Sequence, residues 1–403
     1  MYYVENEYKE NTIRKVFKIL LLLIFLIIFF LLGIFFEKWG GVQRLAPNII
    51  NFIRNNFLGD KTVLELEKKY FDYIDKKNKK NINFQFDNTA DNSTDTPINQ
   101  YVINIAKSYI ENPLLIQDKD YSILKILTDN YIENIPPLYE KEILNEGIWE
   151  KFEISPSTFK PLYAKTFLRT DLERPYAIVY IYRFDMDRLN LEFIPGSEDS
   201  QKRDGKITED QKNRVMWIFS GGFQYKHGKY GMKHNGEILL PPINGAATLF
   251  CYKDGRLEIK EWKEDTSDDE SILWFRQNEL PLIIDGKITD KINRMWGLTP
   301  LDVHPIYTVR SGIGLTKDND IVFAFGESLS AATLALGMIK AGVINGMHLD
   351  MNYFNVHFVR AVKNKYGRLE TFNENDKLSF YKNIYTVTSA RDYFILTKKD
   401  RSE

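Results

Sequence analysis

The pattern of apolar and polar positions divides the chain into three parts. Residues 19–36 form an unbroken apolar run, which as a helix would span ~27 Å, close to the hydrocarbon thickness of a bilayer. Over residues 37–143 the apolar residues recur mainly at helical spacing, and beyond Gly147 they come in short runs typical of strands. We therefore expect a transmembrane helix, then a helical spacer, then a strand-rich domain over residues 144–403.

The charges beside the apolar run predict its orientation. Three basic residues lie close before it, whereas only Lys38 follows closely. The positive-inside rule therefore predicts that residues 1–18 form a cytoplasmic tail and that the rest of the chain lies outside the cytoplasm. No small-x-small cleavage site follows the run, so residues 19–36 are expected to stay as an uncleaved, single-pass signal anchor in the inner membrane.

The spacer is expected to contain three helices and a flexible linker. Asp60 is placed to cap the first helix, and its apolar positions recur at a spacing of about 3.6 residues. These positions are Val63, Leu66, Tyr70, Phe71 and Ile74. Residues 76–97 are polar, with little to bury, and are typical of a mobile linker before the second helix.

The strand-rich part predicts an α+β fold, a mainly antiparallel sheet with few helices. One clear helix is expected near residues 329–341, with Ser328 or Ser330 as its N-cap and Gly342 just past its end. The expected strands cover residues 162–169, 176–184, 189–193, 214–219, 307–315 and 321–325.

Composition narrows the class of protein. The formal net charge is −1 over 403 residues, and the basic residues are spread along the chain, so no nucleic-acid partner is expected. The single cysteine, Cys251, excludes an internal disulfide framework. Within Ala-Thr-Leu-Phe-Cys-Tyr it is typical of a buried strand residue.

Histidines mark where chemistry is expected. All five follow residue 226, and four of them lie in or beside two glycine-containing blocks, 219–232 and 345–357. Histidine is the side chain best suited to proton transfer or metal ligation near neutral pH. The four histidines are His227, His234, His348 and His357. Chance clustering in a histidine-poor chain is the alternative interpretation.

The second block predicts convergent polar side chains. If residues 347–352 form a strand, simple alternation places His348, Asp350 and Asn352 on one face. Three polar groups at a strand end beside a loop are typical of a functional site, although a strand with one solvated face would show the same pattern.

Two further motifs are suited to binding an anion. Ser220, Gly221 and Gly222, called here the glycine block, would let backbone N–H groups approach a ligand closely. Arg310 precedes Ser311 and Gly312, which places a guanidinium beside flexible backbone and favours phosphate recognition.

The order of these motifs resembles the phosphodiester glycosidase family over residues 160–395. The likeness rests on Gly-Gly-Phe at 221–223, on Arg-Ser-Gly-Ile-Gly at 310–314, and on Gly-x-Ser, a helix and Gly-x-x-x-Gly-x-x-Leu-Asp within 325–350. The chain is similar to a divergent bacterial branch, because Ser220 replaces the family's first Asn and no glycine follows its Leu-Asp pair.

The resemblance implies a hydrolase that cleaves a sugar-1-phosphodiester in envelope glycans. Arg310 and the glycine block would hold the phosphate, with Asp350 as base or nucleophile. His227 or His357 would assist proton transfer, and Glu327 is the reserve carboxylate. The remaining substrate-binding candidates are Ser311, Gly312, His348 and Asn352.

Two alternatives remain open. The first is a non-catalytic relative that binds an envelope glycan or a partner protein. This alternative is favoured because Ser220 replaces the family's Asn and other residues replace the family's glycines after Asp350. The second is a metal-dependent hydrolase in which Asp350, His357 and His227 hold Zn²⁺. No organic cofactor is expected, and a divalent metal stays open.

Overall fold

A computed structural model describes most of the strand-rich part of the chain. The described residues are 59–80, 131–140, 143–155, 158, 160–198, 203–266, 270–292, 295–296, 299–300, 305–375, 377–378, 385 and 388–399. The expected cytoplasmic tail, the expected anchor and the second spacer helix lie outside them. No helix within the described ranges is long and apolar enough to cross a membrane.

The chain divides into two compact units, Met1–Leu66 and Glu67–Glu403, and the site lies in the second. The helices of the described residues include α3 (Gly59–Lys80), α6 (Glu209–Arg214), α7 (Tyr225–Gly228) and α8 (Ala331–Lys340), and a 3-10 helix covers Glu264–Thr266.

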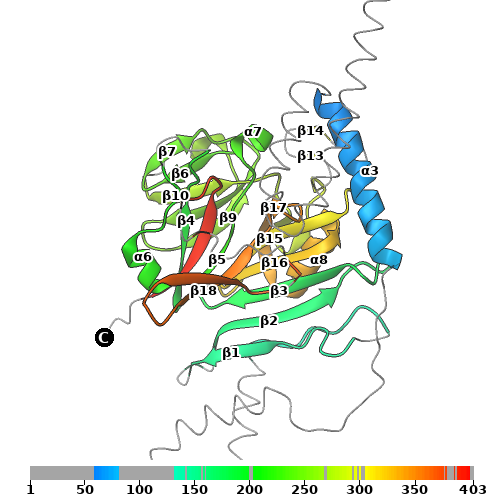
Figure 1. Ribbon diagram of the computed structural model, residues 1–403, viewed down its shortest axis with the longest axis horizontal. Helices are drawn as coiled ribbons and strands as arrows, with labels where there is room; N and C mark the ends of the chain where they lie inside the picture. Colours follow the sequence, from blue (N-terminus) through cyan, green and yellow to red (C-terminus); the bar gives the residue numbers. More distant parts are fainter. Residues whose placement is uncertain are drawn as a thin grey trace, which may run out of the picture. The chain divides into compact units, whose positions relative to one another are not determined.

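The largest sheet has eight strands. They are β1 (Glu150–Ile154), β2 (Pro161–Arg169), β3 (Ile178–Phe184), β11 (Ile283–Ile284), β12 (Lys287–Ile288), β15 (Thr308–Thr316), β16 (Ile321–Leu329) and β17 (Val343–Met351). Their order is β1-β2-β3-β16-β15-β17-β11-β12. Figure 1 shows β15, β16 and β17 side by side, with α8 close to them.

Two five-stranded sheets complete the domain. One contains β4 (Leu189–Ile194), β5 (Val215–Ser220), β18 (Phe358–Lys363), β19 (Leu369–Asn373) and β20 (Tyr393–Lys398), in the order β19-β18-β5-β20-β4. The other contains β6 (Met232–His234), β7 (Glu237–Leu240), β8 (Ala247–Tyr252), β9 (Leu257–Glu261) and β10 (Ile272–Gln277), in the order β7-β6-β10-β8-β9. A short ribbon pairs β13 (Met295–Trp296) with β14 (Thr299–Pro300).

The three large sheets share one apolar core, and strand alternation explains how. On β16, Phe323 and Phe325 point into the core that also contains Trp217 and Phe394 of the β5–β20 sheet. The alternate β16 residues, such as Val322, belong to a second core formed with α8. The eight-stranded sheet is therefore apolar on both faces, as expected for a central layer.

Helix α8 confirms the predicted helix. Ser330 is its N-cap and accepts a hydrogen bond from the Thr333 N–H at 3.0 Å. Gly342 follows the helix with φ +91°, the left-handed conformation that favours glycine. A Cβ at Gly337 would lie 2.9 Å from Val179 Cγ1, so glycine lets the helix pack directly on β3.

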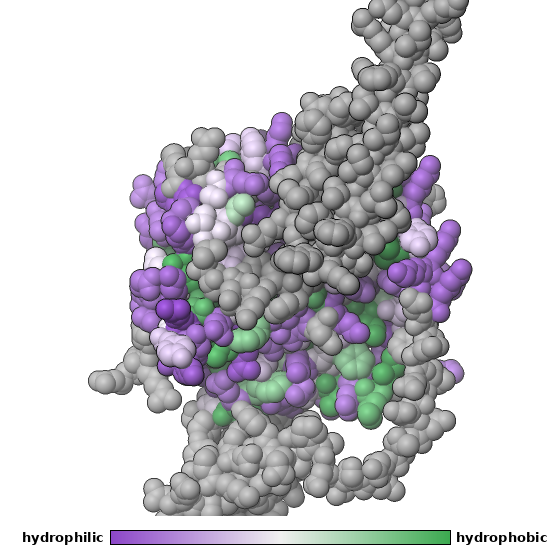
Figure 2. All heavy atoms as spheres, viewed as in Figure 1, coloured by the Kyte–Doolittle hydropathy of each residue, from purple (hydrophilic) through white to green (hydrophobic). Residues whose placement is uncertain are grey.

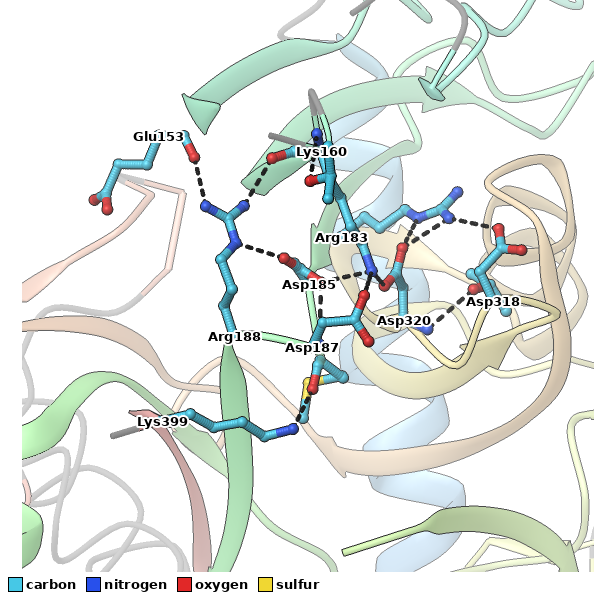
Figure 3. A network of polar contacts seen from close by, with 12 residues as sticks. Glu153, Lys160, Arg183, Asp185, Asp187, Arg188, Asp318, Asp320 and Lys399 are labelled. Carbon is cyan, nitrogen blue, oxygen red and sulfur yellow. Dashed lines mark hydrogen bonds and ion pairs between the residues drawn. The ribbon is translucent and has the colours of Figure 1, made fainter. Parts of the chain in front are cut away.

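An ion cluster, called here the Lys160 cluster, ties β2, β3 and the β15–β16 hairpin together (Figure 3). Its members are Lys160, Arg183, Asp185, Asp187 and Asp320. Lys160 Nζ lies 2.5 Å from Asp185, 2.9 Å from Asp187 and 2.7 Å from Asp320. Arg183 bonds the second oxygen of Asp320 at 2.8 Å. The three carboxylates surround one ammonium group, which is the compensation that buried charges need.

The α+β class is confirmed: all strand pairs of the described residues are antiparallel, and the strands outnumber the helices. Cys251 is 6% exposed and lies in β8, as predicted. Two differences stand out. The β6–β10 sheet was not predicted as a unit, and residues 76–80 of the expected linker are helical because α3 continues to Lys80.

On the face seen in Figure 2 the described residues are mostly polar, with small apolar areas between them. Isolated apolar side chains are common on protein surfaces. The described residues of this face therefore form no extended apolar area.

Candidate functional site

The end of β17 does not follow the simple alternation expected for residues 347–352. Gly312 of β15 pairs with His348, but Arg310 pairs with Met351, so one β15 residue opposes two β17 residues between these pairs. Such a bulge changes the direction in which the side chains of the bulged strand point. His348, Asp350 and Asn352 consequently contact different neighbours, and the prediction that they share one face was wrong.

Asp350 lies in a buried ion pair with Arg391. Arg391 Nε donates to Asp350 Oδ2 at 3.2 Å, and Nη2 bonds the same oxygen. The Asp350 side chain is 2% exposed, whereas that of Arg391 is 22% exposed. Burial raises the pKa of Asp350 to about 7, although Arg391 opposes the shift.

A second buried ion pair, Asp392–Arg276, lies beside the first. Arg276 Nε donates to Asp392 Oδ2 at 2.6 Å, and both side chains are fully buried. Both charges act on the pKa of Asp350, Asp392 by raising it and Arg276 by lowering it. Two carboxylates and two guanidinium groups therefore share one buried region.

The glycine block does bind an anionic group, but in this structure the group belongs to the chain itself. Gly222 N–H donates to Asp392 Oδ2 at 3.3 Å, and Gly221 N–H donates to the Asp392 main-chain oxygen at 3.1 Å. Ser220 N–H donates to the His357 main-chain oxygen at 3.1 Å. The expected phosphate cradle is thus occupied by internal acceptors.

Neighbouring main-chain contacts hold the glycine block against β17. Asp350 N–H donates to the Gly221 oxygen at 2.9 Å. Asn278, after β10, donates from Nδ2 to the His348 and Leu349 oxygens at 3.1 Å each, and its Oδ1 accepts from Phe223 N–H at 3.0 Å. Asn278 therefore links three segments that are distant in sequence.

His357 lies at the same site. Its Nδ1 is 3.1 Å from the Tyr385 hydroxyl, and its main-chain N–H donates to Ser220 Oγ at 3.2 Å. Burial and, to a smaller extent, the charge of Arg391 lower the pKa of His357 to about 3. The imidazole is neutral near pH 7, so it can orient the hydroxyl of Tyr385 but does not carry an acidic proton.

Arg310 does not point at Asp350. Its Nε donates to the Leu329 oxygen at 2.9 Å and its Nη2 to the Ile306 oxygen at 2.8 Å. The side chain is buried, and desolvation lowers its pKa to about 10. We therefore correct its predicted role: Arg310 joins the ends of β15 and β16, and Arg391 is the cation paired with Asp350.

The other residues of β15 and β17 are placed around this junction. Ser311 Oγ donates to the Asp350 main-chain oxygen at 2.7 Å, which fixes the bulge. A Cβ at Gly312 would lie 3.0 Å from Met338 Sδ, so Gly312 makes room for α8. His348 is buried and its pKa is lowered by burial and by Arg310. Asn352 has φ +73° and accepts from the Thr308 hydroxyl at 3.2 Å.

Two further candidates lie on other elements. Glu327, on β16, is half-buried, and burial raises its pKa against the opposing charge of Lys377. His227 is half-buried on α7. Within the described ranges, no group of three or more His, Cys, Asp and Glu side chains is arranged to hold a metal ion.

Together these contacts define the Asp350 cluster: Asp350, Arg391, Asp392, Arg276, His357 and Tyr385. It contains a carboxyl group that titrates near neutral pH next to a partly exposed guanidinium, a combination typical of acid–base sites that bind anions. The sequence indicated Asp350 and His357. It contained no motif signal for Arg391, Asp392, Arg276 or Tyr385, which the fold brings together.

No family model matches the chain, and no curated protein is significantly similar to it. The catalytic domain of zebrafish N-acetylglucosamine-1-phosphodiester alpha-N-acetylglucosaminidase, auto-inhibited by its pro-peptide, is structurally similar. The similarity is distant: 13% identity, a TM-score of 0.39, and coverage of 63% of this chain and 88% of that chain.

Two more solved structures show weaker likeness. A hypothetical protein from Synechocystis is 8% identical, with a TM-score of 0.33 and coverage of 59% of this chain and 62% of that chain. A putative exported protein from Burkholderia pseudomallei is 9% identical, with a TM-score of 0.28 and coverage of 55% and 74%. Likeness at such scores carries no activity over to this chain.

Proposed function

We propose that this chain is a membrane-anchored extracytoplasmic hydrolase that cleaves a sugar-1-phosphodiester in envelope glycans. The observation that supports it best is the pairing of Asp350, whose pKa is about 7, with Arg391, whose side chain is 22% exposed. A base and a phosphate-binding cation would then act on one substrate. The family resemblance of the sequence and the apolar run at 19–36 support the substrate class and the location.

In this proposal the bond between the anomeric carbon and the phosphate oxygen breaks. The phosphomonoester leaves with the bonding electrons, and the oxygen of water joins the anomeric carbon. Arg391 binds the phosphate and stabilises the charge that develops on it. Ionised Asp350 accepts the proton of water, or attacks the anomeric carbon itself before water does.

The test is a screen of the purified protein against a panel of sugar-1-phosphodiesters, with release of free sugar as the readout. Asp350→Asn keeps the shape but removes the base, so turnover should drop by a factor on the order of 10²–10⁴. Asp187→Asn is the control, because it makes the same change at a side chain that is 81% exposed and belongs to the Lys160 cluster instead of the Asp350 cluster. Its turnover should equal that of wild type. A wild-type protein inert towards the whole panel would contradict the proposal.

One observation favours the non-catalytic alternative. The N–H groups of the glycine block are occupied by the chain's own acceptors, which leaves them no bond for a phosphate. If the chain only binds a glycan, wild type and Asp350→Asn will be equally inert. Binding of a phosphorylated glycan, measured by calorimetry, will then be the property that changes.

A further inference from the structure

Asp392 has no role in the reaction proposed above, yet it bonds both Arg276 and the glycine block. Its Oδ2 accepts from Arg276 Nε at 2.6 Å and from Gly222 N–H at 3.3 Å. Its main-chain oxygen accepts from Gly221 N–H at 3.1 Å. One residue therefore connects β10, the glycine block and the start of β20.

The glycine at 221 is needed because of Asp392. A Cβ at this position would lie 2.6 Å from Asp392 Oδ2 and 2.8 Å from its Cγ, closer than real Cβ atoms approach. The carboxylate thus fills the space of the missing side chain. Since Gly221 also accepts from Asp350 N–H at 2.9 Å, displacement of the Asp392 carboxylate would move the backbone that holds Asp350.

Asp392 also places a second negative charge beside Asp350. Among the described residues, Asp392 Oδ1 is buried without a hydrogen-bond partner, so Arg276 and Gly222 engage only one of its two oxygens. Like charges in a buried region disfavour each other's ionised form.

The groups that face this pair come from every neighbouring segment. The positive ones are Arg391, in the same loop as Asp392, and Arg276 on β10. The hydroxyl of Tyr385 and the imidazole of His357 are neutral, because burial raises the pKa of Tyr385 well above its ordinary value and lowers that of His357. Asp392 is therefore the group whose negative charge opposes ionisation of Asp350.

We propose that Asp392 is a positioning residue that acts through Asp350: it fixes the glycine block, whose Gly221 oxygen accepts from Asp350 N–H, and it places a second carboxylate beside Asp350. Repulsion between the two carboxylates then favours the protonated form of Asp350. The consequence for catalysis rests on the function proposed above. The effect of Asp392 on the protonation of Asp350 does not depend on that function, and it can be measured without any substrate.

The test is the titration of the Asp350 carboxyl in the full chain, followed by its ¹³C NMR signal and assigned by the loss of that signal in Asp350→Asn. In Asp392→Asn the amide oxygen can still accept from Gly222, but the charge is gone. The midpoint should fall by about one pH unit or more. In Arg276→Gln a positive charge is lost, and the midpoint should rise.

Opposite shifts separate the proposal from a merely structural role, since loosening of the site would move both variants in the same direction. If a single variant does not fold, the double variant Arg276→Gln/Asp392→Asn leaves neither charge unpaired. Its midpoint should lie below that of Arg276→Gln and above that of Asp392→Asn, whichever of the two folds, because the two charges act on Asp350 in opposite directions. An unchanged or higher midpoint in Asp392→Asn, or a double variant whose midpoint is not below that of Arg276→Gln, overturns the proposal.

Kinetics separate this proposal from the proposed function. If sugar phosphodiesters are cleaved, the acid limb of the pH–rate profile should move to lower pH in Asp392→Asn together with the midpoint. Shifted midpoints without any turnover would reject the hydrolase and keep the positioning role. Turnover with an unmoved midpoint would reject the positioning role alone.

Discussion

At the residue scale, burial outweighs the ion pair with Arg391 in setting the pKa of Asp350. An aspartate bonded to arginine ordinarily has a lowered pKa. Here the loss of hydration outweighs the attraction of Arg391, and Asp392 adds repulsion, so the pKa rises from 3.8 to about 7. The residue is therefore partly protonated at neutral pH, which suits a group that takes up a proton and returns it.

This shift predicts how stability depends on pH. Between pH 3.8 and about 7 the folded chain keeps a proton on Asp350 that the unfolded chain has lost. The contribution of this group to stability is therefore complete at low pH and disappears as the pH rises through 7. Relative to Asp350→Asn, wild type should lose roughly 1.4 kcal/mol per pH unit across this window.

Urea unfolding of both proteins at a series of pH values measures this difference. Asp187→Asn provides a control of opposite sign, because the hydrogen bond from Lys160 lowers the pKa of Asp187. The contribution of Asp187 is present above its ordinary pKa and is lost as the pH falls. A stability difference between wild type and Asp350→Asn that stays constant from pH 4 to 7 would contradict the raised pKa.

The sequence allowed only part of this site to be predicted. Asp350 and His357 stand out because they lie in a block of unusual composition. The bulge opposite Ser311 could not be predicted, since it depends on the pairing of two strands. Arg391 and Asp392 were missed for a similar reason: they lie in an ordinary polar loop, and only the position of β20 beside β5 brings them to Asp350.

At the element scale, the cap of α8 is a feature that a single substitution can test. Ser330 Oγ accepts from Thr333 N–H at 3.0 Å, so Ser330→Ala should lower the free energy of unfolding by about 1 kcal/mol. Ser328, the other predicted cap, instead accepts from Asn78 Nδ2 at 2.9 Å. Chemical denaturation of both alanine variants should show the larger loss for Ser330→Ala; a larger loss for Ser328→Ala would contradict this assignment.

The Lys160 cluster should contribute far more than a surface ion pair. Its lysine side chain is 6% exposed, and Asp185 and Asp320 are each 2% exposed. Lys160→Met would remove the ammonium group that Asp185 and Asp320 share, although Arg188 still bonds Asp185 and Arg183 still bonds Asp320. The substitution should therefore cost about 3 kcal/mol. Lys165→Met is the matched control: its partner Glu150 is 46% exposed, so the cost should be about 0–1 kcal/mol.

Equal losses in the two lysine variants would contradict the assigned importance of the cluster. Thermal unfolding followed by circular dichroism is sufficient to compare them. The measurement also tests whether β2, β3 and the β15–β16 hairpin unfold as one unit. If the cluster stabilised only part of the sheet, thermal unfolding of Lys160→Met would show two separate steps.

Elements in which apolar residues recur at a regular spacing were predicted well. Elements that depend on pairing with strands distant in sequence were not. The strand at 162–169 and the helix at 329–341 appear as β2 and α8 with shifts of one or two residues. The β6–β10 sheet was not predicted as a unit because β6 and β7 are short and the sheet lacks a distinctive motif. Its β6 has only three residues, Met232–His234.

At the scale of the whole molecule, the orientation in the membrane remains a prediction of the sequence. If residues 19–36 span the bilayer with the preceding basic residues inside, a reporter that is active only outside the cytoplasm should work when fused after Glu403. Activity of a cytoplasmic reporter at the same position would reverse the orientation. A fusion that ends before residue 19 is the control for a cytoplasmic signal.

The edges of the eight-stranded sheet have a consequence for how copies of the protein behave at high concentration. At one edge β12 has only two residues, Lys287–Ile288. At the other edge β1 carries charged side chains, and Glu153 departs from extended geometry with φ +48°. Short, charged or interrupted edges offer a poor template for another strand. The largest sheet is therefore protected at both ends against edge-to-edge aggregation.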